Sequence, residues 1–182
     1  MNRLFLDCEF TGLVQNTSLI SMALYRDDDC YFYAEFTDFN HQLMNSWIEA
    51  NVMNKLYFKH EYEYLVKADQ KLDIKNCTKV IVDNLRHWLG NFDEIEIWGD
   101  VPVYDWMLFC ELFGGSLNLP KNVFYIPFDV ATLGKIKLKE RDFSRIEYVK
   151  ELLPLNEQQS QHNALIDAKS EKLCFEKLMS HE

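Results

Sequence analysis

The chain has 182 residues, of which 48% are hydrophobic and 14% aromatic, and it carries 19 basic against 29 acidic side chains. This length and apolar content exclude a disordered chain, and we expect residues 1–182 to form a single domain with a sizeable core. The formal net charge of −10 argues against extensive binding to a nucleic-acid backbone, which normally requires a basic face. It permits a small site that binds only the last few nucleotides of a strand.

The short length of the apolar runs and the spacing of the cysteines predict a cytoplasmic protein with no membrane partner. No apolar run approaches the roughly 18–20 residues that a membrane helix needs. Asp7 and Glu9 interrupt the early apolar stretch that a signal peptide would require. The five cysteines are scattered, odd in number and without a CxxC pair, which argues against both a disulfide framework and a zinc site.

Hydrophobic patterns predict strands in the first third of the chain. Residues 3–9 are largely apolar, and further apolar segments follow at 19–25 and 30–36. The turn-like sequence RDDD at 26–29 indicates that the three strands form an antiparallel meander. The segment 40–60 is expected to be a helical insert, and its pattern does not decide between contact with a substrate and contact with a second subunit.

Helices and strands are expected to alternate in the rest of the chain. Helical periodicity predicts helices at 78–90, 105–115 and 163–179, and short apolar runs predict strands at 94–100 and 122–128. A three-strand antiparallel meander followed by alternating helices and strands is typical of an α/β fold, with a mixed sheet flanked by helices.

An acidic pair, Asp7 and Glu9, lies near the end of the first predicted strand. Residues two apart on a strand face the same side, so both carboxylates point together while Cys8 faces away. They are separated by about 6–7 Å along the strand, close enough to reach one cation. The alternative is an ordinary pair on a solvated face. The apolar neighbours instead indicate a buried strand, where unpaired carboxylates are costly unless a cation binds them.

Three further polar residues stand in apolar or helix-forming segments. Asp105 opens a predicted helix, where an acid is commonly a cap, and Asp100 is a competing candidate. His162 and Asp167 would lie about 140° apart on one continuous helix. The two side chains can share one site if Asn163 caps the helix and His162 precedes the helix on a loop. The alternative is that His162 is an ordinary hydrogen-bonding residue near a helix start. Together, four carboxylates and one histidine have the composition of a two-metal site that cleaves phosphodiesters.

These segments resemble the motifs of the DEDD superfamily of 3′→5′ exonucleases, in its histidine (DEDDh) subclass. DCEFTGL (7–13) is similar to the first motif, with its acid-x-acid pair. DVPVYD (100–105) resembles the second, in which an aromatic residue precedes the acid, and this selects Asp105 over the first residue of the segment. HNALIDA (162–168) is similar to the third, where a histidine stands five residues before the last acid. FDVATL (128–133) resembles the Asp-x-x-x-Leu segment between the last two motifs.

Within the superfamily the chain is most similar to the ribonuclease AS-like exoribonucleases, which implies a ribonuclease H-like fold. The resemblance implies that Asp7, Glu9 and Asp167 bind the cation that carries the attacking water. Asp7 would also bridge to a second cation at the leaving oxygen, and Asp105 would hold the shell of this cation partly through water. The implied cofactors are two Mg²⁺ or Mn²⁺ ions, in keeping with oxygen-only ligands. His162 would be the general base, because an imidazole pKa of about 6.5 suits proton abstraction near neutral pH.

The same resemblance implies a substrate, the 3′ end of single-stranded RNA, shortened to nucleoside 5′-monophosphates. Phe10, Thr11, Gly12 and Leu13 follow the first acids, where the superfamily places groups against the last nucleotide. Phe10 and Leu13 either contact the nucleotide or belong to the core. Trp106 either faces the strand or packs behind its neighbouring acid.

Two other functions remain open from the sequence. The same chemistry acts on DNA in some relatives, and no motif reveals a contact to the 2′-hydroxyl that would distinguish RNA. A catalytically silent ribonuclease H-like module that binds a partner is the second alternative. Relatives in the superfamily often form dimers, and the aromatic content is compatible with a homodimer.

Overall fold

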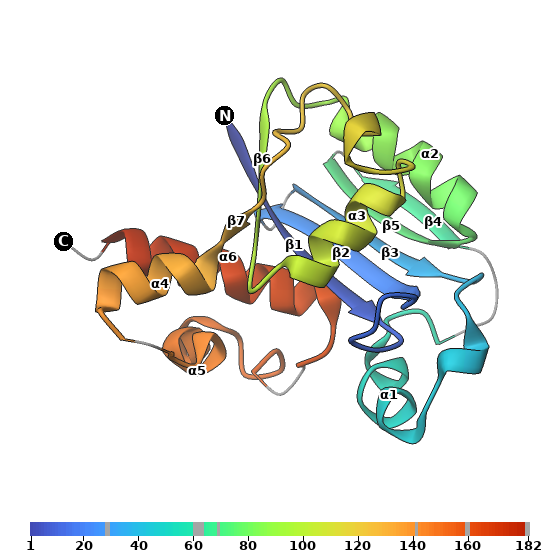
Figure 1. Cartoon of the computed structure of the whole chain (residues 1–182). Coiled ribbons are helices and arrows are strands. Elements are labelled where there is room, and N and C mark those ends of the chain that lie inside the picture. The colour runs from blue at the N-terminus through green and yellow to red at the C-terminus, as the bar shows by residue number, and fades with distance from the viewer. Residues whose placement is uncertain (28–29, 60–63, 69, 141, 159–160, 181–182) are drawn as a thin grey trace.

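A seven-stranded mixed sheet lies at the centre of the computed structural model (Figure 1). The structure describes residues 1–27, 30–59, 64–68, 70–140, 142–158 and 161–180. The strands are β1 (Asn2–Phe10), β2 (Leu19–Asp27), β3 (Cys30–Phe36), β4 (Tyr64–Ala68), β5 (Gln70–Asn76), β6 (Ile95–Gly99) and β7 (Phe128–Asp129). Their order across the sheet is β4-β5-β3-β2-β1-β6-β7. Strand β1 is therefore internal, with β2 antiparallel on one side and β6 parallel on the other.

Helices cover both faces of this sheet. They are α1 (Ser46–Asn51), α2 (Thr78–Leu89), α3 (Val103–Glu111), α4 (Val130–Leu138), α5 (Arg145–Val149) and α6 (Ala164–Ser180). Helices α2 and α3 lie on one face, and α6 packs across β1 and β2 on the other, where it contacts α4 and α5 (Figure 1). No helix within the described ranges has both the length and the apolar character needed to cross a membrane.

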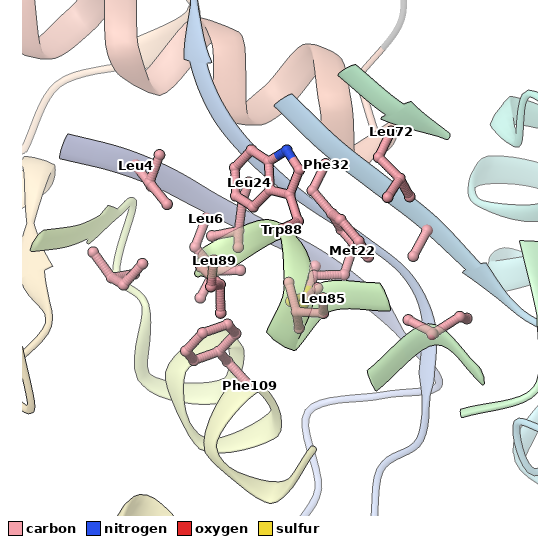
Figure 2. Packing of buried hydrophobic residues seen from close by; sticks show 14 of the residues in the cluster. Leu4, Leu6, Met22, Leu24, Phe32, Leu72, Leu85, Trp88, Leu89 and Phe109 are labelled. Atoms are coloured by element: carbon pink, nitrogen blue, oxygen red, sulfur yellow. The ribbon is translucent and has the colours of Figure 1, made fainter. Parts of the chain in front are cut away.

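The alternation of side chains along β1 separates two hydrophobic clusters. Leu4, Leu6 and Cys8 pack in the cluster beneath α2 and α3, whereas Phe5 packs in the cluster beneath α6. Figure 2 shows the first cluster, in which Leu4 and Leu6 lie with side chains of α2 and with Phe109 of α3. Each such buried side chain stabilises the fold by about 1.5–3 kcal/mol relative to an exposed one. The packing fixes the register of β1, and with it the direction of its acidic residues.

The structure confirms the predicted fold class. Strands β1, β2 and β3 form the antiparallel meander, and helices then alternate with strands around a mixed sheet. The predicted helix at 78–90 corresponds to α2, and Gly90 follows its last residue. Strand β2 continues to Asp27, so the predicted turn begins later than expected, and residues 28–29 of that turn lie outside the described residues. The insert expected at 40–60 contains α1 between two short 3₁₀ turns.

Two element predictions were wrong in detail. Residues 122–128 do not form a continuous strand: Val123 makes one isolated bridge with Ile95, and β7 begins only at Phe128. Phe124, Tyr125 and Ile126 between them are exposed, so this apolar run does not face the core. Pro127 also lacks the N–H that a strand ladder uses.

Helix α3 starts at Val103 rather than at residue 105, and ends at Glu111. Gly114 and Gly115 follow in left-handed backbone conformations, which glycine adopts without steric cost. The sequence-based assignment also omitted β4 and β5. In β5 the buried residues Leu72 and Ile74 alternate with half-buried polar ones, a short period-two pattern in a polar segment.

Phe109→Ala tests the packing of α3 against the sheet. Phe109 is fully buried, and its ring centroid lies 5.2 Å from that of Phe113 and 5.7 Å from that of Trp106. We expect the substitution to lower the free energy of unfolding by about 3–5 kcal/mol in urea titrations. Leu117→Ala is the control, because Leu117 is 99% exposed and should change stability by less than about 0.5 kcal/mol. Equal effects of the two substitutions would contradict this packing.

Candidate active site

Asp7 and Glu9 lie at the carboxyl end of β1 and face α6. Their carboxylate oxygens and those of Asp167 on α6 lie within 4.8 Å of one another. Cys8, between the two acids, belongs to the hydrophobic cluster on the opposite face of the sheet. The structure thus confirms that the pair points to one side, and it brings a third carboxylate to the pair from the far end of the chain.

The start of α6 holds Asp167 and His162 in the arrangement that the sequence favoured. The side chain of Asn163 accepts hydrogen bonds from the backbone N–H groups of Leu165 (3.2 Å) and Ile166 (3.3 Å), which caps the helix. His162 precedes this cap in a left-handed backbone conformation, with φ of 66°. Its backbone N–H donates to Asp167 Oδ2 at 2.8 Å, so the histidine and the acid are held to each other across five residues.

Asp105 is joined to β1 rather than to its own helix terminus. It is the third residue of α3, and its Oδ1 accepts a hydrogen bond from the backbone N–H of Cys8 at 2.9 Å. This bond places Asp105 beside the acidic pair. The competing candidate, Asp100, forms an ion pair with Arg145 at 2.8 Å. Its negative charge is therefore partly balanced by the protein itself, whereas that of Asp105 is not.

One pocket of about 640 Å³ is lined by all five predicted catalytic residues together with Phe10 and Leu13. Phe10 stacks on Tyr104 with ring centroids 5.7 Å apart and an interplanar angle of 26°. Leu13 is 72% exposed, so it is not a core residue. An aromatic pair and an exposed leucine thus lie at the same pocket as the carboxylates.

The remaining residues predicted to contact substrate do not line this pocket. Thr11 is buried, and its hydroxyl accepts a hydrogen bond from the backbone N–H of Ser18 at 2.9 Å, which stabilises the loop after β1. Gly12 sits in that loop with φ of 152°, in a conformation that favours glycine. Trp106 packs against the cluster beneath α2 and α3 and stacks on Phe109. Of the two positions that the sequence allowed for Trp106, the structure shows the one behind the acid.

The carboxylates raise one another's pKa in this buried setting. Burial, followed by repulsion from neighbouring acids, raises the pKa of Asp7 well above its ordinary value and that of Glu9 to about 8. Burial also raises the pKa of Asp167 to about 7 and that of Asp105 to about 6, although backbone N–H donors to both oppose the rise. Asp7 Oδ2 is buried and has no hydrogen-bond partner in the described structure. A divalent cation fits this set of oxygens, because it would neutralise them and supply the missing partner.

The histidine is the one predicted site residue whose pKa moves down. His162 is half-buried, and burial followed by the nearby positive charge of Lys55 lowers its pKa below the usual value. Its ring meets that of Trp47, from the insert, edge to face at a centroid distance of 5.1 Å. The imidazole is therefore uncharged near neutral pH and able to accept a proton.

Sequence reasoning missed two residues of the pocket, Arg145 and Glu171. Glu171 had a usable signal, since it stands four residues after Asp167 and shares its helix face. Arg145 had none, because its position depends on how the loop before α5 folds. Trp47 also lines the pocket, and it lies in the insert for which the sequence left open contact with a substrate or with a second subunit.

The chain is similar in sequence to proteins that are named 3′-5′ exoribonucleases. Residues 2–179 match the model of the Rv2179c-like family, described as the 3′-5′ exoribonuclease Rv2179c-like domain. Two curated proteins from strains of Mycobacterium tuberculosis, the 3′-5′ exoribonucleases Rv2179c and MT2234.1, are each 27% identical over 121 residues, which are 66% of this chain and 67% of each relative.

Among solved structures, the ribonuclease domain of yeast Pop2 is similar in fold. The TM-score is 0.64 at 14% sequence identity, over 98% of this chain and 78% of the Pop2 chain. This likeness confirms the ribonuclease H-like architecture that the family resemblance implied. With three ordered motifs gathered at one pocket and a family match over nearly the whole sequence, the chain belongs to the Rv2179c-like 3′-5′ exoribonuclease domain family.

Proposed function

We propose that the protein is a 3′→5′ exoribonuclease that depends on divalent cations and releases nucleoside 5′-monophosphates from single-stranded RNA ends. The observation that carries the proposal is the half-buried cluster of Asp7, Glu9 and Asp167, with carboxylate oxygens within 4.8 Å of one another. RNA is the favoured substrate because both curated relatives are named exoribonucleases. All five site residues come from this chain, so we propose that residues 1–182 act as one exonuclease domain.

The carboxylates divide into two overlapping sets. Asp7, Glu9 and Asp167 would hold one cation, and Asp7 with Asp105 would hold a second, with Asp7 common to both. Oxygen-only donors favour Mg²⁺ or Mn²⁺. When bound, the cations would stabilise the negative charge that develops on the phosphate and on the leaving oxygen.

His162 would accept the proton of the attacking water. Its lowered pKa keeps the imidazole neutral near pH 7, which a general base requires. The backbone bond to Asp167 and the edge contact with Trp47 limit where the ring lies. The proton acceptor is thus held next to the carboxylates that would hold the cations.

The pocket accounts for a preference for chain ends. Phe10 offers an aromatic surface for a terminal base, a contact worth about 1–3 kcal/mol per stacked base in other proteins. Leu13 adds an exposed apolar side chain beside it. The net charge of −10 disfavours long contact with a phosphate backbone, so we propose that only the last nucleotides are bound. A homodimer and a cytoplasmic location stay predictions from the sequence.

Degradation of end-labelled strands tests the activity. With 5′-labelled RNA and Mg²⁺ or Mn²⁺, we expect a ladder that shortens from the 3′ end, and none when a chelator is present. Asp7→Asn, which keeps the side-chain volume but removes the charge, should abolish the ladder. Asp83→Asn is the matched control, because Asp83 is exposed on α2. A ladder on matched DNA but not on RNA would overturn the proposed substrate, and no ladder on either would favour a binding module.

The role of the histidine is tested by His162→Ala. Loss of a general base should lower kcat by about 10²–10⁴-fold. Binding of Mn²⁺, measured by calorimetry, should stay near that of the unaltered protein, because the carboxylates remain. His87→Ala, at an exposed position of α2, should change neither quantity. If His162→Ala reduces cation binding as much as turnover, the histidine is not a base but part of the cation site.

Stability without cations should depend on pH in a definite direction. The folded-state pKa values of Glu9 and Asp167 are raised to about 8 and about 7, from ordinary values of 4.5 and 3.8. At a pH between the ordinary pKa and the raised pKa of each group, the folded state binds more protons than the unfolded state. The free energy of unfolding therefore falls as pH rises through this range. In chelator we expect the unfolding temperature to drop by several degrees from pH 6 to pH 8. Saturating Mn²⁺ should flatten this decline; a chelated protein equally stable at both pH values would contradict the burial of these acids.

A further inference from the structure

A further acidic side chain, Glu171, lies at the same pocket and has no role so far. It stands on α6 four residues after Asp167, hence on the same side of the helix. It is only 6% exposed, and it lines the pocket together with Asp7 and Asp105. A glutamate that is buried this deeply is rare unless it is paired or coordinates a metal.

The two oxygens of Glu171 have different surroundings. Oε1 accepts a hydrogen bond from the backbone N–H of Asp100 at 2.9 Å. Oε2 is buried and has no hydrogen-bond partner in the described structure. Among the described residues that line the pocket, the cationic side chain is Arg145, and it is paired with Asp100 at 2.8 Å and Asp142 at 3.0 Å. Among the described lining residues, no cationic side chain is therefore available to balance the charge of Glu171, and a cation that enters the pocket would do so.

The hydrogen bond between Glu171 and the backbone of Asp100 stabilises the turn between β6 and α3. In this turn Val101 has φ of 50°, a left-handed conformation that is strained for a β-branched residue. Its backbone N–H donates to Asp129 Oδ1 at 2.9 Å, so Asp129 and Glu171 together hold the turn. Helix α3 begins directly after it and carries Asp105. The position of Asp105 thus depends on a side chain of α6.

We propose that Glu171 is a further carboxylate of the cation centre: Oε1 fixes the turn that positions Asp105, and Oε2 directs negative charge toward the bound cations. The inference rests on the proposed function, because it assumes that cations occupy the pocket. In this role Glu171 is a positioning residue that also raises the affinity of the centre for divalent ions. It does not touch the reacting atoms.

Glu171→Gln separates the charge from the hydrogen bond. Glutamine keeps an oxygen that accepts from the N–H of Asp100 and has nearly the same volume, but it has no charge. We expect Mn²⁺ affinity, measured by calorimetry, to fall by about 10–100-fold. The cation-free variant should also unfold at a higher temperature than the unaltered protein, since one of several repelling carboxylates is removed. Glu176→Gln, an exposed position on the same helix, should change neither value.

The outcomes distinguish this inference from the proposed function. If Glu171→Gln binds Mn²⁺ as tightly as the unaltered protein, the charge of Glu171 does not serve the cations, its role is confined to the hydrogen bond, and the inference fails. A cation-free variant that unfolds at a lower temperature would also contradict the inference, because removing the charge would then relieve no repulsion. Asp7→Asn is measured alongside and should lose most Mn²⁺ binding whatever Glu171 does. A failure of the unaltered protein itself to bind Mn²⁺ would overturn both the inference and the proposed function.

Discussion

The fold brings carboxylates together at one end of β1, where they repel one another and have little access to water. Strand β1 pairs with β2 along the acidic pair and with β6 over residues 2–5, so Asp7 and Glu9 cannot turn away to solvent without breaking the register of its hydrophobic residues. Asp167 and Asp105 approach from two helices, and Asp7 Oδ2 is left without a partner. Such a cluster is unfavourable by itself, and two divalent cations would convert the repulsion into a binding site. Stability and activity are therefore expected to respond together when cations are removed.

The protein holds these repelling groups with backbone N–H donors rather than with cationic side chains. Asp105 accepts from the N–H of Cys8, and Asp167 accepts from that of His162. Backbone donors stabilise a carboxylate without a full positive charge, so they orient it while leaving its charge available to a cation. Asp100 has the opposite arrangement, because Arg145 pairs with it directly. This difference gives a physical reason why the acid at the end of β6 is structural in our account and the acid on α3 is catalytic.

Much of the fold and of the proposed site could be predicted from the sequence because the signals were local. The acid-x-acid spacing on an apolar strand fixed the common direction of Asp7 and Glu9, and the capping residue Asn163 placed Asp167 within the first turn of α6. What depended on tertiary contacts was not predictable. Trp106 carried no sign of which side of α3 it faced, and the apolar run at 122–128 looked like a strand although residues 124–126 at its centre are exposed. Trp47 reaches His162 only because the insert folds back over the end of the sheet.

Anomalous diffraction from crystals grown with Mn²⁺ and a nucleoside 5′-monophosphate would show whether divalent cations occupy the carboxylate cluster. We expect a manganese peak bounded by Asp7, Glu9 and Asp167, and a second peak between Asp7 and Asp105, with the phosphate of the product against both. We also expect the base to lie beside Phe10. A pocket with no anomalous peak at saturating Mn²⁺, while the carboxylates keep the arrangement described above, would contradict the claim that divalent cations resolve the repulsion at the end of β1.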